Sequence, residues 1–232
     1  MNLNDPAAVA EEYASERGLL GRREAYRYAD GPDAPALAVG AVLEIRPARV
    51  LEVGCGPGEA AARIQESGAE VEAVDVSERM AELTRNRGVN ARVGDVQELP
   101  FADGSFDCAL AAWMLYHVPD VERAVSELAR VLRPGGRLVA VTNRREHLQE
   151  LAQLVDDWPR SSFDDVNGPP LLHRHFTHVE ERDVGGWITF PDRAAVVSYV
   201  DASRQLFSGS LPPGADVPLR VRRAPVIYVA TR

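Results

Sequence analysis

The stretch that most constrains the fold runs from Val50 to Ile64 and reads VLEVGCGPGEAAARI. A short apolar run leads into glycines at positions 54, 56 and 58, and a helical pattern follows at once. Glycine costs conformational entropy wherever it is fixed, so this spacing indicates a place where side chains would obstruct the backbone. A strand, a glycine-rich turn and a helix in this order are typical of nucleotide-type cofactor sites.

The same alternation of strands and helices continues along the chain. Apolar runs predict strands over 49–53, 70–75, 91–93, 106–113 and 137–143. Helical patterns fill the intervals, including one capped by Ser77 and one capped by Asp120. Strands separated by helices of this length predict βαβ units and a parallel sheet covered on both faces.

Beyond residue 143 the rhythm loosens. We expect helices over 146–158 and 192–207, strands over 184–190 and 223–231, an irregular segment over 159–178, and a loop or hairpin over 208–222. The domain organisation that follows is a helical cap or lid over 1–46 and a main domain over 47–232, with a variable insert on the substrate side over 144–183. A chain of 232 residues is long enough for such a core.

Composition limits the partners of the chain. Its formal net charge of −9 weighs against tight nucleic-acid binding, which draws its affinity from neutralised phosphates. No run approaches the roughly 18 consecutive apolar residues of a membrane span. The polar, acidic start MNLNDPAAVAEEY lacks the pattern of a secretory signal. We therefore expect a cytoplasmic protein with no membrane and no nucleic-acid partner.

The cysteines and histidines give no metal pattern. Cys55 and Cys108 are too few for a disulfide framework or a four-ligand zinc site, and Cys55 fits a tight turn better than it fits a reactive thiol. His173, His175 and His178 show no matching ligand spacing. We expect no metal.

Acidic residues accompany the glycine turn. Asp75 ends the second predicted strand, roughly 20 residues beyond the loop, where a carboxylate can accept hydrogen bonds from ribose hydroxyls. Asp95 follows the third predicted strand, where it could accept from the exocyclic amine of an adenine. The alternatives are an ordinary helix-entry residue at 75 and an ordinary turn residue at 95.

The spacing of the loop separates two kinds of cofactor. A dinucleotide site usually reads G-x-G-x-x-G and holds a pyrophosphate at a helix N-terminus. This chain has G-C-G-P-G, with Glu52 two residues before the first glycine. A carboxylate there repels a pyrophosphate and suits a ligand with positive charge, such as the sulfonium and ammonium groups of S-adenosylmethionine.

Four blocks of the sequence resemble the class I S-adenosylmethionine-dependent methyltransferases, and within them the methyltransferase type 11 group. The blocks are VLEVGCGPG (50–58), VEAVDVSERM (71–80), GDVQELPFADGSFDCALAAWMLYHVPD (94–120) and LRPGGRLVAVTN (132–143). The resemblance implies a Rossmann-like α/β fold with a seven-stranded, mostly parallel sheet and helices on both faces. Its last strand is antiparallel, and residues 223–231 could supply it.

The resemblance also implies which residues meet the cofactor. The glycine loop lies along its methionine and ribose part, Asp75 holds both ribose hydroxyls, and Asp95 reaches the adenine amine. The expected cofactor-binding residues are Glu52, Gly54, Cys55, Gly56, Gly58, Asp75, Val76, Met80, Asp95, Val96, Ala111 and Trp113. Residues expected at the lid or the acceptor are Tyr13, Tyr26, Tyr28, His173 and His175.

The expected activity is in-line transfer of a methyl group to an oxygen, nitrogen or carbon atom of a small-molecule acceptor. Alignment of the reactants supplies most of the rate, and a base is needed only if the acceptor must lose a proton. His117 is the candidate base, although a histidine in this position commonly shapes the cofactor pocket. The Asn/Asp-Pro-Pro-Tyr signature of many methyltransferases that act on nucleic-acid bases is absent after the fourth strand.

Two other functions stay open at this stage. The chain could be a non-catalytic S-adenosylmethionine-binding protein, since an intact pocket does not exclude lost chemistry. It could also be a nicotinamide-dependent oxidoreductase, which the glycine spacing and Glu52 disfavour.

Overall fold

The computed structural model describes residues 3–155, 161–203 and 216–232. Its main sheet has seven strands in the order β3-β2-β1-β4-β5-β9-β6, and β9 runs antiparallel to both of its neighbours. The strands are β1 (Arg49–Val53), β2 (Glu70–Asp75), β3 (Asn90–Val93), β4 (Phe106–Ala112), β5 (Leu132–Asn143), β6 (His178–Asp183) and β9 (Pro225–Thr231). The predicted fold class is confirmed, including the antiparallel strand near the C-terminus.

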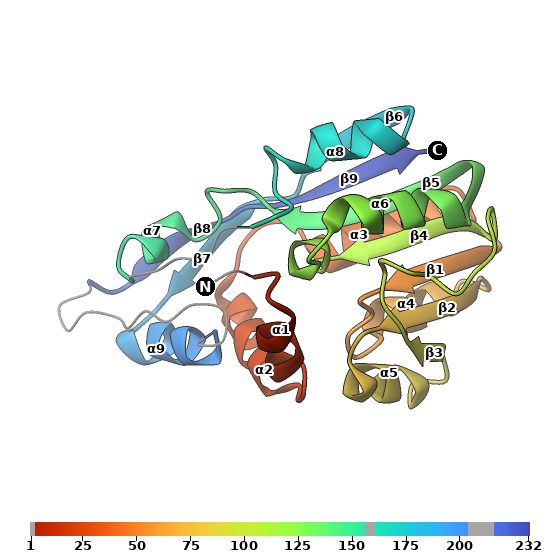
Figure 1. Cartoon of the computed structure of the whole chain (residues 1–232). Helices are drawn as coiled ribbons and strands as arrows, with labels where there is room; N and C mark the ends of the chain where they lie inside the picture. The colour runs from red at the N-terminus through yellow and green to blue at the C-terminus, as the bar shows by residue number, and fades with distance from the viewer. Residues whose placement is uncertain (1–2, 156–160, 204–215) are drawn as a thin grey trace.

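Helices cover both faces of this sheet (Figure 1). Side chains of β4 alternate between two buried clusters: Ala109 and Ala111 belong to one, Cys108 and Leu110 to the other. The first cluster is closed by α6 (Val121–Val131) and α8 (Gly168–His175), and the second by α3 (Ala34–Leu43) and α4 (Glu59–Gln65). α5 (Glu78–Arg85) packs against β2 and β3.

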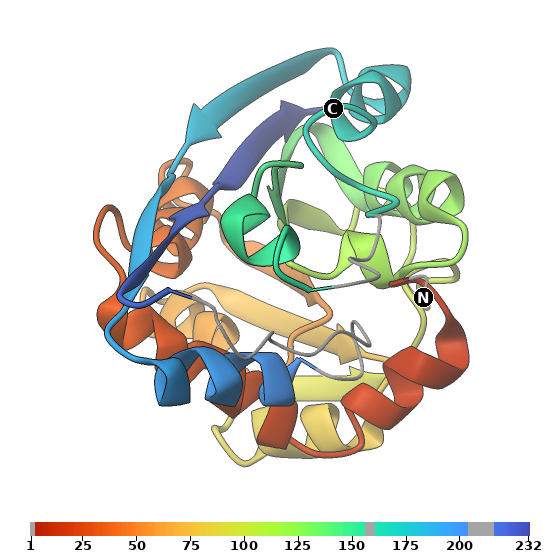
Figure 2. The ribbon, with the colours of Figure 1, turned by 90° about the vertical axis from the view of Figure 1, so that its left-hand side faces the viewer.

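A smaller unit stands at the carboxyl ends of the parallel strands. Here β7 (Gly186–Phe190) pairs antiparallel with β8 (Leu219–Arg223), and the short helices η1 (Ala25–Tyr28) and α7 (Gln149–Ala152) pack against this pair with α9 (Arg193–Ala202). The remaining helices are α1 (Pro6–Glu12), α2 (Arg17–Glu24) and η2 (Leu115–His117). Figure 2 shows α9 beside the N-terminal helices, and α2 contacts α9 directly.

The first 46 residues do not form a single cap over the main sheet. Ala38 and Val42 of α3 are buried with Val50 and Leu110 in the core of the main sheet. The segment that lies over the carboxyl end of the sheet consists of α1, α2 and η1. The helix at the end of the expected cap is therefore part of the main domain's core.

Strand β5 begins earlier than predicted. The prediction placed its start at 137, after Pro134-Gly135-Gly136, but Leu132 already pairs with Phe106 of β4. A register shift between Phe106 and Cys108 accommodates the glycine turn. The backbone N–H of Gly135 donates to the carbonyl of Arg232, which ties the turn to the end of β9.

Three further segments differ from the prediction. The stretch 168–175, expected to be irregular, forms α8, because Pro169 and Pro170 fall in its first turn, where a missing N–H costs nothing. β6 begins at the last residue of the predicted irregular segment and covers 179–183, for which no element was predicted, and β8 overlaps the predicted loop or hairpin over 208–222. The predicted helices over 146–158 and 192–207 extend into 156–160 and 204–215, which lie outside the described residues.

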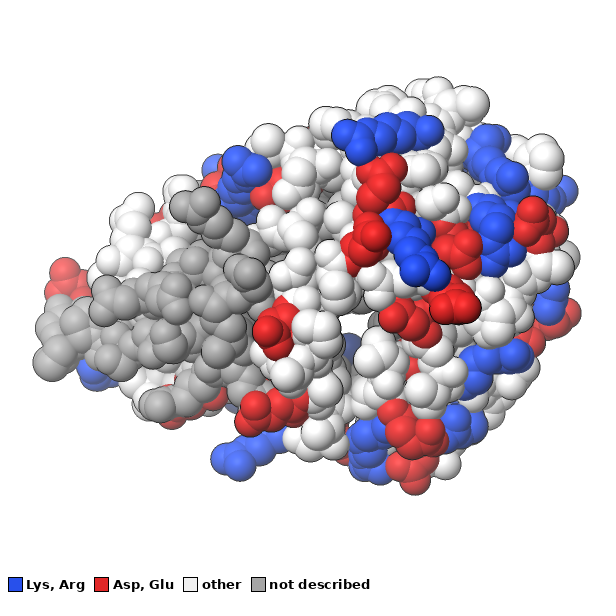
Figure 3. Space-filling view, in the orientation of Figure 1, with Lys and Arg blue, Asp and Glu red and all other residues white. Residues whose placement is uncertain are grey.

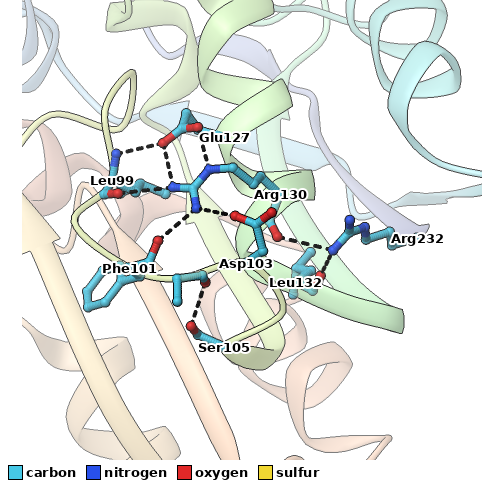
Figure 4. Close-up of polar contacts among 9 residues, drawn as sticks. Leu99, Phe101, Asp103, Ser105, Glu127, Arg130, Leu132 and Arg232 are labelled. Carbon is cyan, nitrogen blue, oxygen red and sulfur yellow. Dashed lines mark hydrogen bonds and ion pairs between the residues drawn. The ribbon is translucent and has the colours of Figure 1, made fainter.

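Arg130 of α6 orders the loop between β3 and β4 (Figure 4). Its guanidinium donates to the carbonyl oxygens of Leu99 at 3.0 Å and Phe101 at 2.7 Å. It also pairs with the carboxylates of Asp103 at 2.8 Å and Glu127 at 2.7 Å. The loop also contains the segment 94–97, so the network supports that segment from the part of the loop that follows it.

Candidate functional site

A cavity of about 1460 Å³ lies where the parallel strands end, under the N-terminal helices. Its lining comes from the glycine loop, the ends of β2 and β4, α1, α2, and the corner between β8 and β9. In Figure 3 the surface is hollowed between the N-terminal helices and the part of the molecule that contains β3 and α5. The cavity thus lies at the edge where open α/β sheets bind ligands.

The glycine loop has a conformation that other residues rarely adopt. Gly54, Gly56 and Gly58 have φ angles of 61°, 53° and 77°. A Cβ on Gly58 would lie 2.6 Å from the hydroxyl oxygen of Thr84, whereas a Cβ on Gly56 would meet nothing within 4 Å. Gly58 is thus required for packing against α5, and Gly56 leaves the cavity side of the loop bare.

Thr84 of α5 holds the loop from behind. Its hydroxyl donates to the carbonyl of Gly56 at 2.9 Å and lies 3.3 Å from the sulfur of Cys55. Because that hydroxyl has one proton, the Cys55 thiol is the donor to it. Burial raises the pKa of the Cys55 thiol, in agreement with a packed residue in a tight turn.

Asp75, the last residue of β2, connects the loop to the next helix. One carboxylate oxygen accepts from the backbone N–H of Gly56 at 2.9 Å, and the other accepts from the backbone N–H of Ser77 at 2.9 Å. Burial raises the pKa of Asp75, and these two N–H groups oppose that shift. Each oxygen keeps a lone pair that can accept from a ligand in the cavity.

Glu52 supplies a buried acid. Its side chain lines the cavity, the residue is 3% exposed, and its Oε2 atom has no hydrogen-bond partner. Burial is the main cause that raises the pKa of Glu52 to about 8; a hydrogen bond with the backbone of Ala61 acts against this shift, and the neighbouring charge of Asp75 acts with it. A buried carboxyl with one oxygen left without a partner is costly, so this position suits a ligand that brings a positive charge or a donor.

The far end of the same lining has a different character. Asp95 accepts from the backbone N–H and the side-chain amide of Gln97, both at 2.8 Å. Val96 is buried and Val76 is 56% exposed, and both line the cavity. This part of the lining therefore combines two apolar side chains with a carboxylate.

Trp113 follows β4 in a strained conformation. Its φ angle is 53°, in the left-handed region, and its indole N–H donates to the side-chain oxygen of Asn143 at 3.3 Å. Both residues line the cavity. Such strain in a non-glycine residue persists where the surroundings enforce it, commonly at binding sites.

The N-terminal segment is fastened over the cavity. The hydroxyl of Tyr13 lies 2.9 Å from Nε2 of His117, and Nδ1 of His117 lies 2.8 Å from the carbonyl oxygen of Leu3. A carbonyl only accepts, so Nδ1 carries the proton and Nε2 accepts from Tyr13. Burial lowers the pKa of His117 to about 4 and raises that of Tyr13 to about 12.

Two contacts to α5 fasten the same segment. The Ser77 hydroxyl donates to the carbonyl of Tyr13 at 2.8 Å. Arg79 pairs with Glu16 at 2.9 Å. The segment is therefore held by the same helix that supports the glycine loop.

Most of the residues predicted at the site line this one cavity. They are Tyr13, Tyr26, Glu52, Gly54, Cys55, Gly56, Asp75, Val76, Asp95, Val96, Trp113 and His117. Gly58, Met80 and Ala111 lie behind the lining, where Met80 and Ala111 are fully buried. Tyr28 is also absent from it.

The structure does not bring His173 and His175, the residues expected near the acceptor, to this cavity. Both lie on α8, outside the cavity lining, and Nε2 of His175 is 2.7 Å from a carboxylate oxygen of Glu122 on α6. The helix α8, which was not predicted, contacts α6 and β6, and both histidines therefore lie away from the cavity. The sequence did not predict His147, Tyr199 and Arg223 as cavity residues, because no local motif marks them.

Within residues 3–155, 161–203 and 216–232, no group of three or more histidine, cysteine, aspartate or glutamate side chains could hold a metal ion. In those same ranges no helix has the length and apolar character needed to cross a membrane.

Comparison with known proteins identifies relatives across most of the chain. The methyltransferase domain family matches residues 51–140. The chain is 34% identical over 179 residues to an uncharacterized methyltransferase of Mycobacterium tuberculosis, covering 75% of this chain and 71% of that protein. It is 37% identical over 195 residues to a ubiquinone biosynthesis O-methyltransferase of Xanthomonas oryzae, covering 77% of this chain and 78% of that protein.

The fold also recurs among solved structures. A SAM-dependent methyltransferase of Thermotoga maritima, described as a possible histamine N-methyltransferase, superposes with a TM-score of 0.61. The alignment covers 93% of both chains at 24% identity. At this identity the likeness concerns the fold.

Proposed function

Because the chain belongs to the methyltransferase family, we propose that it transfers a methyl group from S-adenosylmethionine to a small-molecule acceptor. S-adenosylmethionine is the methyl donor of the class that the four sequence blocks resemble. The observation that carries the proposal is the convergence of Glu52, the bare glycine loop and Asp75 on one cavity. Their chemistry fits this cofactor: Glu52, with one buried oxygen free of a partner, suits its ammonium group, the open backbone suits its methionine chain, and Asp75 suits its ribose.

Each group of residues then has a binding role. Glu52 receives the ammonium group, Gly54 and Gly56 let the cofactor lie against the backbone, and Asp75 accepts from the ribose hydroxyls. Asp95 accepts from the adenine amine, while Val76 and Val96 flank the ring. The sulfonium supplies an activated methyl group and leaves as a neutral sulfide, so the protein's task is to align the acceptor and exclude water.

The enclosed space favours a small acceptor. Ligand cavities commonly measure about 300–1,000 Å³, and this one, at about 1460 Å³, has room for a second molecule beside the cofactor. We propose that α1, α2 and η1 form the cap over that second molecule. A net charge of −9 disfavours an RNA or DNA acceptor.

His117 holds the cap in this arrangement. Both ring nitrogens are engaged, one with Tyr13 and one with the Leu3 carbonyl. To serve as a base, His117 must take the acceptor's proton through Tyr13 or release that contact. We propose that its principal role is to position the N-terminal segment.

The experiment that tests the proposal uses cofactor with a labelled methyl group. The protein is incubated with it and with three acceptor sources: a small-molecule cell extract, total RNA, and the extract's proteins. Transfer into the small-molecule fraction supports the proposal. Label only in RNA or protein would contradict the acceptor class.

Two results would select another function. Tight binding of S-adenosylhomocysteine with no transfer to any of the three fractions would favour a non-catalytic binding protein. Binding of NADH in place of S-adenosylhomocysteine would favour an oxidoreductase.

A further inference from the structure

Arg223 is a buried cation at the corner between β8 and β9. The residue is 4% exposed and lines the cavity. One terminal nitrogen donates to the carbonyl of Pro32 at 2.5 Å, and its Nε atom has no hydrogen-bond partner. Within the described chain, no carboxylate lies within ion-pair distance of it.

The other arginines along the cavity differ from Arg223. Four of them have an acidic partner, in the pairs Arg22–Glu12, Arg23–Glu59, Arg144–Glu181 and Arg145–Asp164. Arg63 is exposed to solvent. Since a buried charge is costly unless it is paired, the lack of a counter-charge at Arg223 requires an explanation.

His147 provides a second donor at the same corner. Its Nδ1 atom accepts from the backbone N–H of Ala224 at 3.0 Å, so Nδ1 is unprotonated and the neutral ring carries its proton on Nε2. Among the described residues Nε2 has no partner, and the residue lines the cavity.

The backbone holds this histidine rigidly. The N–H of Leu148, a residue in the left-handed region with φ 56°, donates to the carbonyl of Arg222 at 2.7 Å. The positive charge of Arg223 and burial together keep the pKa of His147 low, at about 3, with burial the larger cause. The ring is therefore a neutral donor that lies close to the guanidinium.

We propose that Arg223 and His147 form a subsite for an anionic group of the methyl acceptor, and that this group is a carboxylate. The inference rests on the proposed function and deepens it, because it assigns a chemical class to the acceptor. An arginine guanidinium matches the planar carboxylate, and together with the Nε2–H of His147 it offers donors for the two carboxylate oxygens.

Other features of the corner agree with this class. The ring of Tyr26 lies 5.9 Å from the guanidinium carbon of Arg223 and also lines the cavity. It gives an apolar surface beside the charged group. Glu52 and Asp75 belong to the glycine-loop part of the lining, so the cavity has an acidic part for the cofactor and a basic corner for the acceptor.

The test measures the thermal stability of the full chain, saturated with S-adenosylhomocysteine, as chloride is replaced by acetate at constant ionic strength. Acetate is the smallest carboxylate probe, and a ligand that binds the folded state raises the melting temperature. We expect a saturable rise of about 2–4 °C in the wild type. Arg223→Met should abolish the rise, and His147→Phe should reduce it.

Arg222→Met is the matched control, because Arg222 is adjacent and half-exposed and pairs with Glu146. It should keep the full response to acetate. No saturable rise in the wild type, or the same rise in Arg223→Met, overturns the inference. The affinity for S-adenosylhomocysteine, measured for each variant, shows separately whether the variant folds and binds the cofactor. If the wild type itself does not bind S-adenosylhomocysteine, the proposed function is contradicted and not this inference.

Discussion

The carboxylate of Asp75 accepts a hydrogen bond from the backbone N–H of Gly56 at 2.9 Å. This contact joins the end of the second strand to the centre of the glycine loop, 19 residues earlier in the chain. It fixes the acid and the bare backbone as one unit facing the cavity.

Glu52 should release a proton when a cofactor binds. Its pKa of about 8, raised by burial, keeps it mostly protonated at pH 7. An ammonium group beside it favours the carboxylate, so binding of S-adenosylhomocysteine at pH 7 should release up to one proton. Calorimetry in two buffers of different ionisation enthalpy measures this number. Glu52→Gln should bring it close to zero, and an unchanged value in that variant would refute the assignment.

Gly56 and Gly58 should respond differently when each is changed to alanine. Gly58→Ala places a Cβ 2.6 Å from the Thr84 hydroxyl at a φ of 77°, so it should lower the free energy of unfolding by about 2–4 kcal/mol. Gly56→Ala meets no atom within 4 Å and should cost about 1–2 kcal/mol from its φ alone. Because its methyl group enters the cavity, it should weaken S-adenosylhomocysteine binding.

Urea unfolding and calorimetric titration of both alanine variants separate the two effects. If Gly56→Ala binds the ligand as tightly as the wild type, the cofactor does not lie against this part of the backbone.

Acid should destabilise the protein through two histidines. Burial lowers the pKa of His117 to about 4 and of His147 to about 3, below the ordinary value of 6.5. Below pH 6.5 each of these histidines therefore binds more protons in the unfolded chain than in the folded one, and its contribution to stability is lost as the pH falls. The loss is about 1.4 kcal/mol per pH unit for each histidine. Glu52, whose pKa is raised to about 8, contributes a slope of opposite sign over the same window.

Melting temperatures at pH 7.5 and 5 measure this dependence. His147→Phe should flatten it, because one of the two groups no longer titrates. A slope identical to that of the wild type would show that His147 is not held neutral in the folded state.

Arg130→Met should loosen the loop between β3 and β4. The guanidinium serves two carbonyls and two carboxylates (Figure 4), and hydrogen bonds to a charged group are worth about 1.5–3 kcal/mol each at most. We expect a loss of about 2–3 kcal/mol in unfolding free energy and faster amide exchange over 99–105. Arg133→Met removes an exposed ion pair with Asp107 and should cost under about 1 kcal/mol. Equal effects of the two variants would contradict the role of Arg130.

The part of the fold that sequence could predict is the part with local signals. The apolar strands, the glycine turn and the caps at Ser77 and Asp120 are encoded by neighbouring residues, and these elements form as predicted, apart from the earlier start of β5. β6 has no such signal, since HVEERD is polar along its length and becomes a strand only by pairing with β9 at the edge of the sheet. α8 was obscured by Pro169 and Pro170, which punctuate turns as readily as they begin helices.

The candidate site divides in the same way. Glu52, Asp75 and Asp95 follow predicted strands, so their meeting at one edge could be deduced. Arg223 and His147 lie 76 positions apart and meet only because the loop after β5 hydrogen-bonds to the corner of β8 and β9. No spacing in the sequence encodes that contact.

Calorimetric titration with S-adenosylhomocysteine tests the central claim most directly, on the wild type, Asp75→Ala and the control Asp103→Ala, whose acid pairs with Arg130 away from the cavity. We predict micromolar binding to the wild type and the control, and binding about 100-fold weaker in Asp75→Ala, which loses two acceptors for the ligand. No binding to the wild type, or equal affinity in Asp75→Ala, would contradict the account.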